Sequence, residues 1–293
     1  MNKLAYLHYD KDKNSLVKAY FIALIPLLLF SFYKNGILLY QNELISFIDM
    51  FIPFYFCGIS IIVGFLIAYI NKSDKWETIL YALILACTTS INTNMLIYPI
   101  VLFVSLFIAG FLKKKKEFNL LAFTRILLIL ALLFNSYSYM NVAEKIHAFN
   151  YNTFDILIGY GVGGLASNSL FFCLIAFLIL SFNKFYKRMI PIMSSISFLI
   201  ILFLLFLITK NNVYLENILN GSAYFAFVFV GTDLYVTPCT KTGKIIYGII
   251  IGLLTAILSL FVPIYEAPYI AILFFSFFFL TFDKIAYKKR LQV

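Results

Sequence analysis

Long apolar runs separated by short polar segments dominate the chain. The runs extend over about 15–24 residues, which is enough for a helix to cross a hydrocarbon core of about 30 Å. They lack the short alternating segments of a membrane β-barrel. The pattern therefore predicts an all-α integral membrane protein with about ten transmembrane helices. The predicted spans are residues 19–33, 47–70, 78–91, 94–112, 120–135, 155–182, 189–209, 220–233, 245–262 and 267–283.

Some of these runs are short or interrupted by polar residues and glycine. The run at 155–182 contains several glycines, and we expect its helix to break there. Two other runs are short for a full crossing, which predicts broken or half-length helices of the kind that line cavities inside membrane proteins. The polar stretch CTTSINTN, residues 87–94, is predicted to be a turn on the outer side.

The distribution of basic residues orients the spans. Of the 23 lysines and arginines, 19 fall in segments that share a side with the N-terminus. Lys34, Lys145 and Lys210 fall on the other side, and Arg125 lies within a span. Because basic residues gather in cytoplasmic loops, both termini are predicted to be cytoplasmic. The first run lacks a cleavage motif and is predicted to be a retained signal anchor in a bacterial cytoplasmic (inner) membrane.

The longest polar loop on the outer side, residues 135–153, divides the chain into two sets of five spans. An odd number of spans in each set places the two halves in opposite orientations, as in transporters built from inverted repeats. We therefore expect a single membrane domain over 1–293, with pseudo-halves at about 19–135 and 155–283 and short cytoplasmic tails. This repeat is inferred from counting, since the halves show no clear sequence similarity.

Composition narrows the classes of function. Apolar residues make up 63% of the chain and charged residues 12%, against roughly 25% charged residues in soluble domains. The net charge of +10 follows from the membrane topology, and no nucleic-acid partner is predicted. The four cysteines are scattered, without a CxxC pair or ligand cluster, so no metal site is predicted. The lipid bilayer is the one partner that composition requires.

Three ionisable residues lie in or beside predicted spans. Asp233 ends an apolar run in FVGTDLYVTP, beside Thr232, and we expect it to face a cavity or an ion path. Arg125 in FTRILLIL is a second ion-path candidate, because a charge in the bilayer centre is costly unless it faces a cavity or a partner. A position near the membrane interface is the alternative for Asp233 and Arg125 and the favoured interpretation for Asp155.

The segment GYGVGGLASNS, residues 159–169, is the second candidate site. Its glycines, Gly163 among them, allow the backbone to approach a ligand or another helix closely. Ser167 and Ser169 precede an apolar run and have the chemistry of a helix N-cap, and a helix N-terminus attracts anions such as phosphate. Close helix packing through small residues is the alternative.

The C-terminal stretch from 219 to 284 resembles a known family. Its glycine, its TDLYVTPCTKTGKIIYG sequence and its later YEAPYIAIL helix resemble the D subunit of Rnf complexes and the B subunit of sodium-pumping NADH:quinone oxidoreductase, the RnfD/NqrB family. The matching positions include Gly221, Thr232, Asp233, Thr237, Pro238, Gly243, Tyr247, Gly248, Tyr265, Glu266 and Asp283. Weaker resemblance upstream includes Gly159, Gly163, Ser169 and Arg125.

The resemblance implies a fold and a cofactor. Family members have a urea-transporter-like arrangement, and a threonine in an SGAT-like motif carries FMN. Here the corresponding stretch, NSYSYMNVAEKIHAFN at residues 135–150, contains no threonine. The sequence is therefore identified as a divergent member in which flavin, as FMN or riboflavin, is expected to bind non-covalently. Gly163, Ser167, Ser169, Thr232 and Asp233 are the expected binding residues, around one pocket between the halves.

The function implied by the resemblance is that of a membrane subunit in an Rnf/Nqr-like electron-transport complex. Such a subunit couples flavin-mediated electron transfer to Na⁺ or H⁺ translocation and is not catalytic alone. Its expected partners are the other membrane subunits and a flavinylated protein. The alternatives are a urea-transporter-like solute or flavin transporter or channel that has lost redox chemistry, and a scaffold that anchors a flavinylated lipoprotein.

Overall fold

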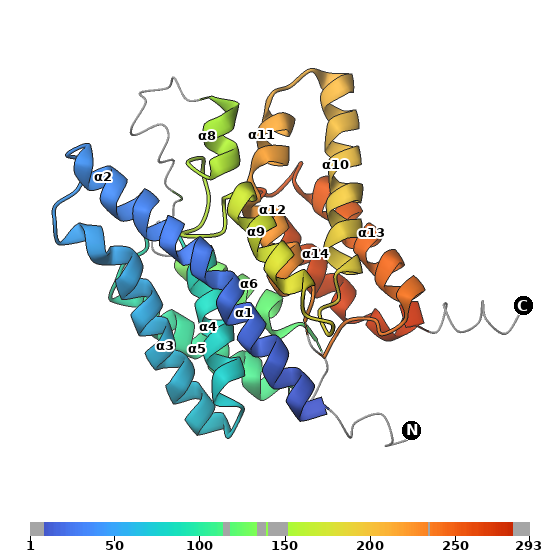
Figure 1. The fold of residues 1–293 in the computed structure, drawn as a ribbon, viewed down its shortest axis with the longest axis horizontal. Helices are drawn as coiled ribbons and strands as arrows, with labels where there is room; N and C mark the ends of the chain where they lie inside the picture. Colours follow the sequence, from blue (N-terminus) through green and yellow to red (C-terminus); the bar gives the residue numbers. More distant parts are fainter. Residues whose placement is uncertain (1–8, 114–117, 134–138, 140–151, 234, 284–293) are drawn as a thin grey trace, which may run out of the picture.

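The computed structural model describes residues 9–113, 118–133, 139, 152–233 and 235–283. Throughout this part of the chain the regular secondary structure is helical, as the run lengths predicted. Figure 1 shows the helices of the first half, blue to green, beside those of the second half, yellow to red. Residues 135–138 and 140–150, where the flavin-attachment motif of the family would fall, lie outside the described residues.

The first half begins with a long helix that changes its winding before it ends. Helix α1 passes into the π-helix η2 and the short helix α2, and the 3-10 turn η3 leads into α3. Helix α3 packs against α4 and α5, and α5 packs against α6. The bounds are α1 Tyr9–Phe32, η2 Tyr33–Ile37, α2 Leu38–Gln41, η3 Asp49–Phe51, α3 Ile52–Asn71, α4 Lys75–Thr88, α5 Ile97–Lys113 and α6 Leu120–Leu133.

The second half begins with the predicted break, because α8 and α9 are separate helices on either side of the glycine-rich segment. Helix α10 packs against α11, η4 and α13, and α13 packs against α14. Between the halves, α1 packs against α9 and α6 packs against α14. The bounds are α8 Thr153–Ile158, α9 Leu170–Ser181, α10 Met189–Thr209, α11 Val213–Leu219, α12 Gly221–Phe225, η4 Ala226–Val230, α13 Lys241–Leu258 and α14 Ala267–Ser276.

Helix length separates full-length spans from short ones. Among the described residues, five continuous helical segments are long and apolar enough to cross a membrane: Lys13–Gln41, Asp49–Asn71, Met189–Thr209, Val213–Val230 and Lys241–Leu258. The others are shorter, with 14 residues in α4 and α6, 12 in α9 and 10 in α14. At 1.5 Å per residue, these four extend roughly 15–21 Å, less than the hydrocarbon core. The prediction of a short helix is confirmed for the run at 78–91, which gives α4, whereas the run at 220–233 belongs to the continuous segment Val213–Val230, which is long enough to cross.

The outer surface of the helices is apolar. Large hydrophobic side chains are exposed along α3 and α10, including Ile62 at 56%, Phe65 at 47%, Phe203 at 50% and Leu207 at 55%. Monomeric soluble proteins rarely expose apolar patches of such extent, and lipid tails solvate them without cost. Together with the apolar spans, this surface identifies the chain as an integral membrane protein.

The N-terminal segment and the loops near Asp74 and Asn183, which the charge pattern assigned to the side of the N-terminus, lie together at one end of the molecule. Lys13 forms an ion pair with Asp74, at 3.1 Å, and the Asn183 side chain donates to the Ser15 carbonyl, at 3.3 Å. The opposite end holds α2, α8 and α11 (Figure 1). Lys34, which the sequence placed in an outer loop, is instead buried, since α1 continues through it into η2.

Candidate functional site

The segment that contains Thr232 and Asp233 forms a helix end, as predicted. Helix η4 ends at Val230, and Asp233 accepts hydrogen bonds from the backbone N–H groups of Tyr235, at 2.8 Å, and Val236, at 3.1 Å. The hydroxyl of Thr232 donates to the Val228 carbonyl, at 2.6 Å. Both predicted residues are buried, at 2% and 5% exposure. Asp233 therefore satisfies its own turn with one carboxylate oxygen, Oδ1.

The other carboxylate oxygen of Asp233 faces side chains from the first half. Tyr81 of α4 donates to Oδ2 at 3.4 Å, and Tyr20 of α1 shares a hydrogen bond of 2.6 Å with the Thr232 hydroxyl. Tyr81 also lines a cavity of about 410 Å³, within the size range of small-molecule sites. The polar side chains that line this cavity are Lys13, Asn71, Ser73, Asp74, Glu77, Thr78, Tyr81 and Tyr235.

The charges of this cavity are mostly negative. Lys13 contacts Glu77 at 2.6 Å, and Tyr235 donates to Glu77 at 2.8 Å. Burial alone would raise the pKa of Asp74, but the hydrogen bond and charge of Lys13, with two backbone N–H donors, lower it overall. Two carboxylates beside one ammonium group favour a cation over an anion such as phosphate.

A lysine contacts residues 231–238, which we call the aspartate segment, on the side away from Tyr81. Lys187, in the loop between α9 and α10, donates to the Thr237 hydroxyl and, at 3.3 Å, to the Thr237 carbonyl. Thr237 in turn donates to the Asp233 carbonyl at 2.8 Å. Burial lowers the pKa of Lys187, although the nearby charge of Asp233 acts in the opposite direction. The segment is therefore fixed by the backbone of its own turn and by side chains from three other elements.

The glycine-rich segment, residues 159–169, crosses the polar stretch that follows α4, and we call this segment the crossing. The N–H of Leu165 donates to the Thr89 carbonyl at 2.7 Å, and the N–H of Ala166 donates to the Cys87 carbonyl at 2.9 Å. Ser31 and Asn35 of the first half both donate to the Leu165 carbonyl, at 2.9 Å. The stretch predicted as an outer turn is thus largely buried, and its backbone pairs with the second half.

Lys34, just after the end of α1, donates hydrogen bonds to the same segment. Its ammonium group, 2% exposed, donates to the Asn168 side chain at 2.8 Å and to the Gly159 carbonyl at 3.2 Å. It lies in the π-helix η2, a winding that is often found at functional positions. Lys34 was not predicted as a site residue because its neighbours along the chain are polar, although it directly follows an apolar run.

Close packing explains the glycines of this segment. A Cβ atom at Gly163 would lie 2.4 Å from the Cβ of Asn168, and one at Gly164 would lie 2.5 Å from the Thr88 carbonyl oxygen. Ser169 caps α9 by accepting from the Phe172 N–H at 3.2 Å, as its N-cap chemistry predicted. The small-residue packing alternative therefore describes how this segment is used in the fold.

Arg125 lies where the two halves meet. Its side chain is fully buried, and it pairs with Glu266 at the start of α14, at 3.2 Å. Tyr139 also hydrogen bonds to both side chains, and the guanidinium group lies 5.7 Å from the centre of the Tyr269 ring. The second carboxylate oxygen of Glu266, Oε2, is buried without a hydrogen-bond partner among the described residues.

Helices α6 and α14 cross through reciprocal contacts at their ends. Asn119, just before α6, donates from its backbone to Ser276 at the end of α14, at 3.1 Å, and from its side chain to the Val230 carbonyl, at 2.8 Å. Glu266, just before α14, contacts Arg125 in α6. The two short helices therefore run antiparallel, and each begins against the other half of the chain.

The structure groups the predicted site residues into three places. Thr232 and Asp233 lie together, Gly163, Ser167 and Ser169 lie in the crossing, and Arg125 pairs with Glu266. Helix α1 contacts Thr232 through Tyr20 and the crossing through Ser31, roughly 17 Å further along its axis at 1.5 Å per residue. No hydrogen bond between described residues joins the crossing to Thr232 or Asp233.

Asp155 lies at the start of α8, and its position near the membrane interface stays a prediction. It completes a capping box at the start of α8, accepting from the Asn152 N–H at 2.8 Å.

The model of the NQR2, RnfD, RnfE family matches this sequence over residues 1–292. This match covers nearly the whole chain, including the upstream segments in which the resemblance was weaker. The helical architecture, the apolar outer surface and the breaks at 159–169 and 231–238 agree with the resemblance drawn from the motifs. The chain belongs to the NQR2, RnfD, RnfE family.

Proposed function

We propose that the chain is a membrane subunit of an Rnf/Nqr-type complex that couples flavin-mediated electron transfer to the movement of Na⁺ or H⁺. The observation that carries this proposal is the family match over residues 1–292. Members of such complexes work with other membrane subunits and, in this proposal, with a flavinylated partner. Electron transfer belongs to the assembled complex, and ion movement involves this chain.

The ion path runs through Asp233 and past Arg125. The second oxygen of Asp233 accepts from Tyr81, and Tyr81 lines a negatively charged cavity at the end proposed to be cytoplasmic. Deeper in the molecule, the buried Oε2 atom of Glu266 lacks a hydrogen-bond partner among the described residues. A buried carboxylate oxygen is stabilised by a proton or a cation, so both places suit a cation in transit.

The proposed topology has ten crossings, both termini on the cytoplasmic side of the bacterial inner membrane, and two inverted halves. Corresponding packing supports it: α3 packs on α4 and α5 in the first half, and α10 packs on η4 and α13 in the second. The pairs α1–α9 and α6–α14 would then each relate a helix to its own counterpart across the pseudo-two-fold axis.

The described residues test where a flavin fits. At the crossing, Gly163 and Gly164 are already in contact with neighbouring atoms, and the carbonyl of Leu165 is occupied by Ser31 and Asn35. The crossing therefore does not fit a flavin ring or its phosphate, and the cavity beside Asp233 has the wrong charge for phosphate. We propose that a non-covalent flavin is present in the complex, and we assign none of these residues a role in its electron transfer.

Purification of the intact complex tests the redox proposal. Native absorbance would reveal flavin, and a denaturing gel would separate covalent from released flavin by fluorescence. We expect a flavin spectrum, released flavin after denaturation and no fluorescence in the band of this chain. Fluorescence in that band would overturn the non-covalent assignment. Absence of flavin from every fraction would overturn the electron-transfer function.

A transporter or channel for a small solute or for flavin is the second candidate. It is favoured by the absence of threonine from residues 135–150, where the family motif would fall. Uptake of labelled riboflavin and urea into proteoliposomes that contain this chain alone separates the two functions. Saturable uptake would support transport, whereas flux limited to Na⁺ or H⁺ in the energised complex would support the first proposal.

A further inference from the structure

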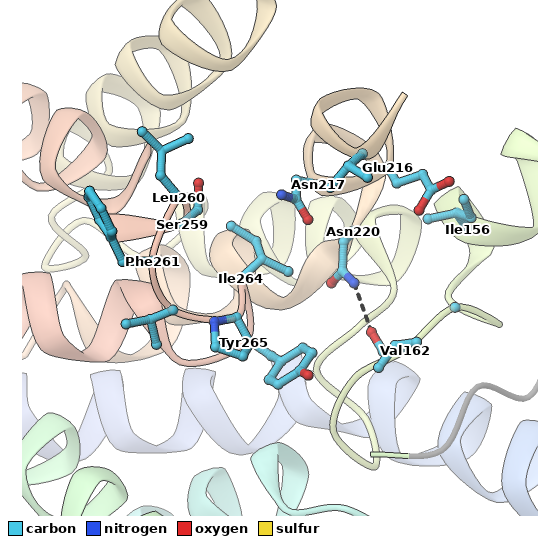
Figure 2. A pocket seen from close by; sticks show the side chains of 14 residues that line it. Ile156, Val162, Glu216, Asn217, Asn220, Ser259, Leu260, Phe261, Ile264 and Tyr265 are labelled. Atoms are coloured by element: carbon cyan, nitrogen blue, oxygen red, sulfur yellow. Dashed lines mark hydrogen bonds between the residues drawn. The ribbon is translucent and has the colours of Figure 1, made fainter. Parts of the chain in front are cut away.

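A second cavity opens at the end of the molecule opposite Asp233. Figure 2 shows it between α11, the glycine-rich segment and the loop that joins α13 to α14. Its volume is about 450 Å³, which is ample room for water.

The charge of this outer cavity has one sign. Among the described residues that line it, Glu216 carries the one full charge at neutral pH. Asn217, Asn220 and Ser259 add uncharged dipoles, and no lysine or arginine is among them. In a chain of net charge +10, a cavity lined in this way raises the local concentration of cations and lowers that of anions.

The cavity wall is held in a fixed shape. Asn220 donates to the Val162 carbonyl at 2.8 Å, the hydrogen bond drawn in Figure 2, and accepts from the Ser222 N–H at 2.9 Å. These bonds join α11 and α12 to the glycine-rich segment. The polar side of the cavity is therefore part of the packed second half, while Glu216 stays exposed at its mouth.

The inner wall approaches the buried ion pair. Tyr265 lines the cavity, and its ring centre lies 4.0 Å from that of Tyr139. The Tyr139 hydroxyl hydrogen bonds to Arg125 and to Glu266. One pair of aromatic rings thus lies between this cavity and the charged contact between the two halves.

We propose that this cavity is the outer aqueous entrance of the ion path, where Glu216 gathers monovalent cations and Tyr265 separates them from the Arg125–Glu266 pair. The inference rests on the proposed function for the path itself. It adds the location of the outer mouth, its selectivity for cations and the residue that provides that selectivity.

Thiol labelling tests the entrance without requiring electron transfer. In a Cys239→Ser background, which removes the exposed native thiol, Asn217→Cys would be treated from the outer side of oriented vesicles. Two membrane-impermeant methanethiosulfonates of similar size, one cationic and one anionic, serve as probes. Asn92→Cys, an exposed position outside the cavity lining, gives the intrinsic ratio of the two rates.

We expect the cationic reagent to be favoured at Asn217→Cys by about fivefold relative to Asn92→Cys, as one nearby negative charge allows. Adding Glu216→Gln should remove that preference. Equal ratios at the two positions, labelling from the opposite side of the membrane alone, or a preference that survives Glu216→Gln would each overturn the proposal.

A second measurement connects the cavity to transport. Ion flux by the Asn217→Cys complex is compared before and after labelling of the same preparation, and a decrease of at least about fivefold is expected. Complete labelling with unchanged flux would overturn the entrance. If unlabelled wild-type complex shows no ion flux, the proposed function fails, while the labelling ratios still report on the cavity.

Discussion

The crossing at residues 159–169 and the aspartate segment at 231–238 interrupt the second half in similar ways, yet they use their polar groups differently. In the crossing, backbone N–H groups donate to carbonyls of the first half, and Lys34 donates to two oxygens. In the aspartate segment, Asp233 satisfies its own turn with one oxygen, and its other oxygen accepts from Tyr81, which lines the cavity.

The difference follows from what each segment offers to its surroundings. Glycines let two backbones approach until they satisfy one another, which leaves no room for a ligand. A carboxylate has more acceptor positions than one turn uses, so part of it stays available. An interruption rich in glycine therefore indicates packing here, whereas the interruption with a buried carboxylate is the one in which we propose a site for a cation.

The largest effect is expected from Gly164→Ala. The added Cβ would lie 2.5 Å from the Thr88 carbonyl oxygen, so the two crossing backbones must separate. We expect a loss of about 3 kcal/mol or more in stability, the upper range for overpacking, measured as thermal unfolding in detergent. Gly58→Ala is the control, because nothing lies within 4 Å of its added Cβ. Equal unfolding temperatures for the two variants would contradict the closed crossing.

Asp233→Asn is expected to affect transport more than folding. The amide oxygen keeps the acceptor for Tyr235 and Val236, so stability should change by less than about 1 kcal/mol. Loss of the charge should lower cation transport by the complex about tenfold, equivalent to about 1.4 kcal/mol. Flux in proteoliposomes and thermal unfolding are measured together. Collapse of the fold with this variant would assign Asp233 a structural role instead.

Ser169→Ala tests the other segment of the comparison, the crossing at residues 159–169. Removing the cap of α9 should cost about 1 kcal/mol of stability, with ion transport per folded molecule unchanged. Ser169→Thr keeps an oxygen that accepts from the Phe172 N–H and should recover most of the loss. A transport defect in Ser169→Ala at normal stability would show that the crossing contributes to the path.

Asp74 should give the smallest effect. Asp74→Asn keeps the cap of α4 and removes the charge beside Lys13, so a change within about 0.5 kcal/mol is expected, whereas Asp74→Ala should cost about 1 kcal/mol. Because the pKa of Asp74 is lowered on folding, its contribution is present above the unfolded pKa and is lost as pH falls through the folded pKa. Unfolding of wild type and Asp74→Asn across acidic pH checks this; parallel curves would contradict it.

The arrangement of helices was largely predictable because it depends on run length and on the position of breakers. The glycines at 159–164 predicted the break between α8 and α9, and Ser169 predicted the start of α9. The short run at 78–91 predicted the short helix α4, but the run at 220–233 did not predict that α11, α12 and η4 form one longer segment. These features are local and are therefore visible in a single sequence.

The grouping of the site residues was less predictable because it depends on contacts between distant segments. Lys34 was expected in a loop, but its ammonium group reaches oxygens more than a hundred residues away. Glu266 was noticed as a matching position without a role, and its pairing with Arg125 depends on how α6 and α14 cross. The expectation that Gly163 and Asp233 face one pocket assumed a proximity that periodicity does not encode.

The paired breaks also constrain how the protein is made. The carbonyls of Cys87 and Thr89 accept hydrogen bonds from residues that the ribosome adds about 75 positions later. At 5–20 residues per second, that delay is roughly 4–15 s. Throughout it, these polar groups need water or the insertion machinery, because the hydrocarbon region offers no donors. The first half can therefore enter the bilayer before the second half exists, but it completes its structure only afterwards.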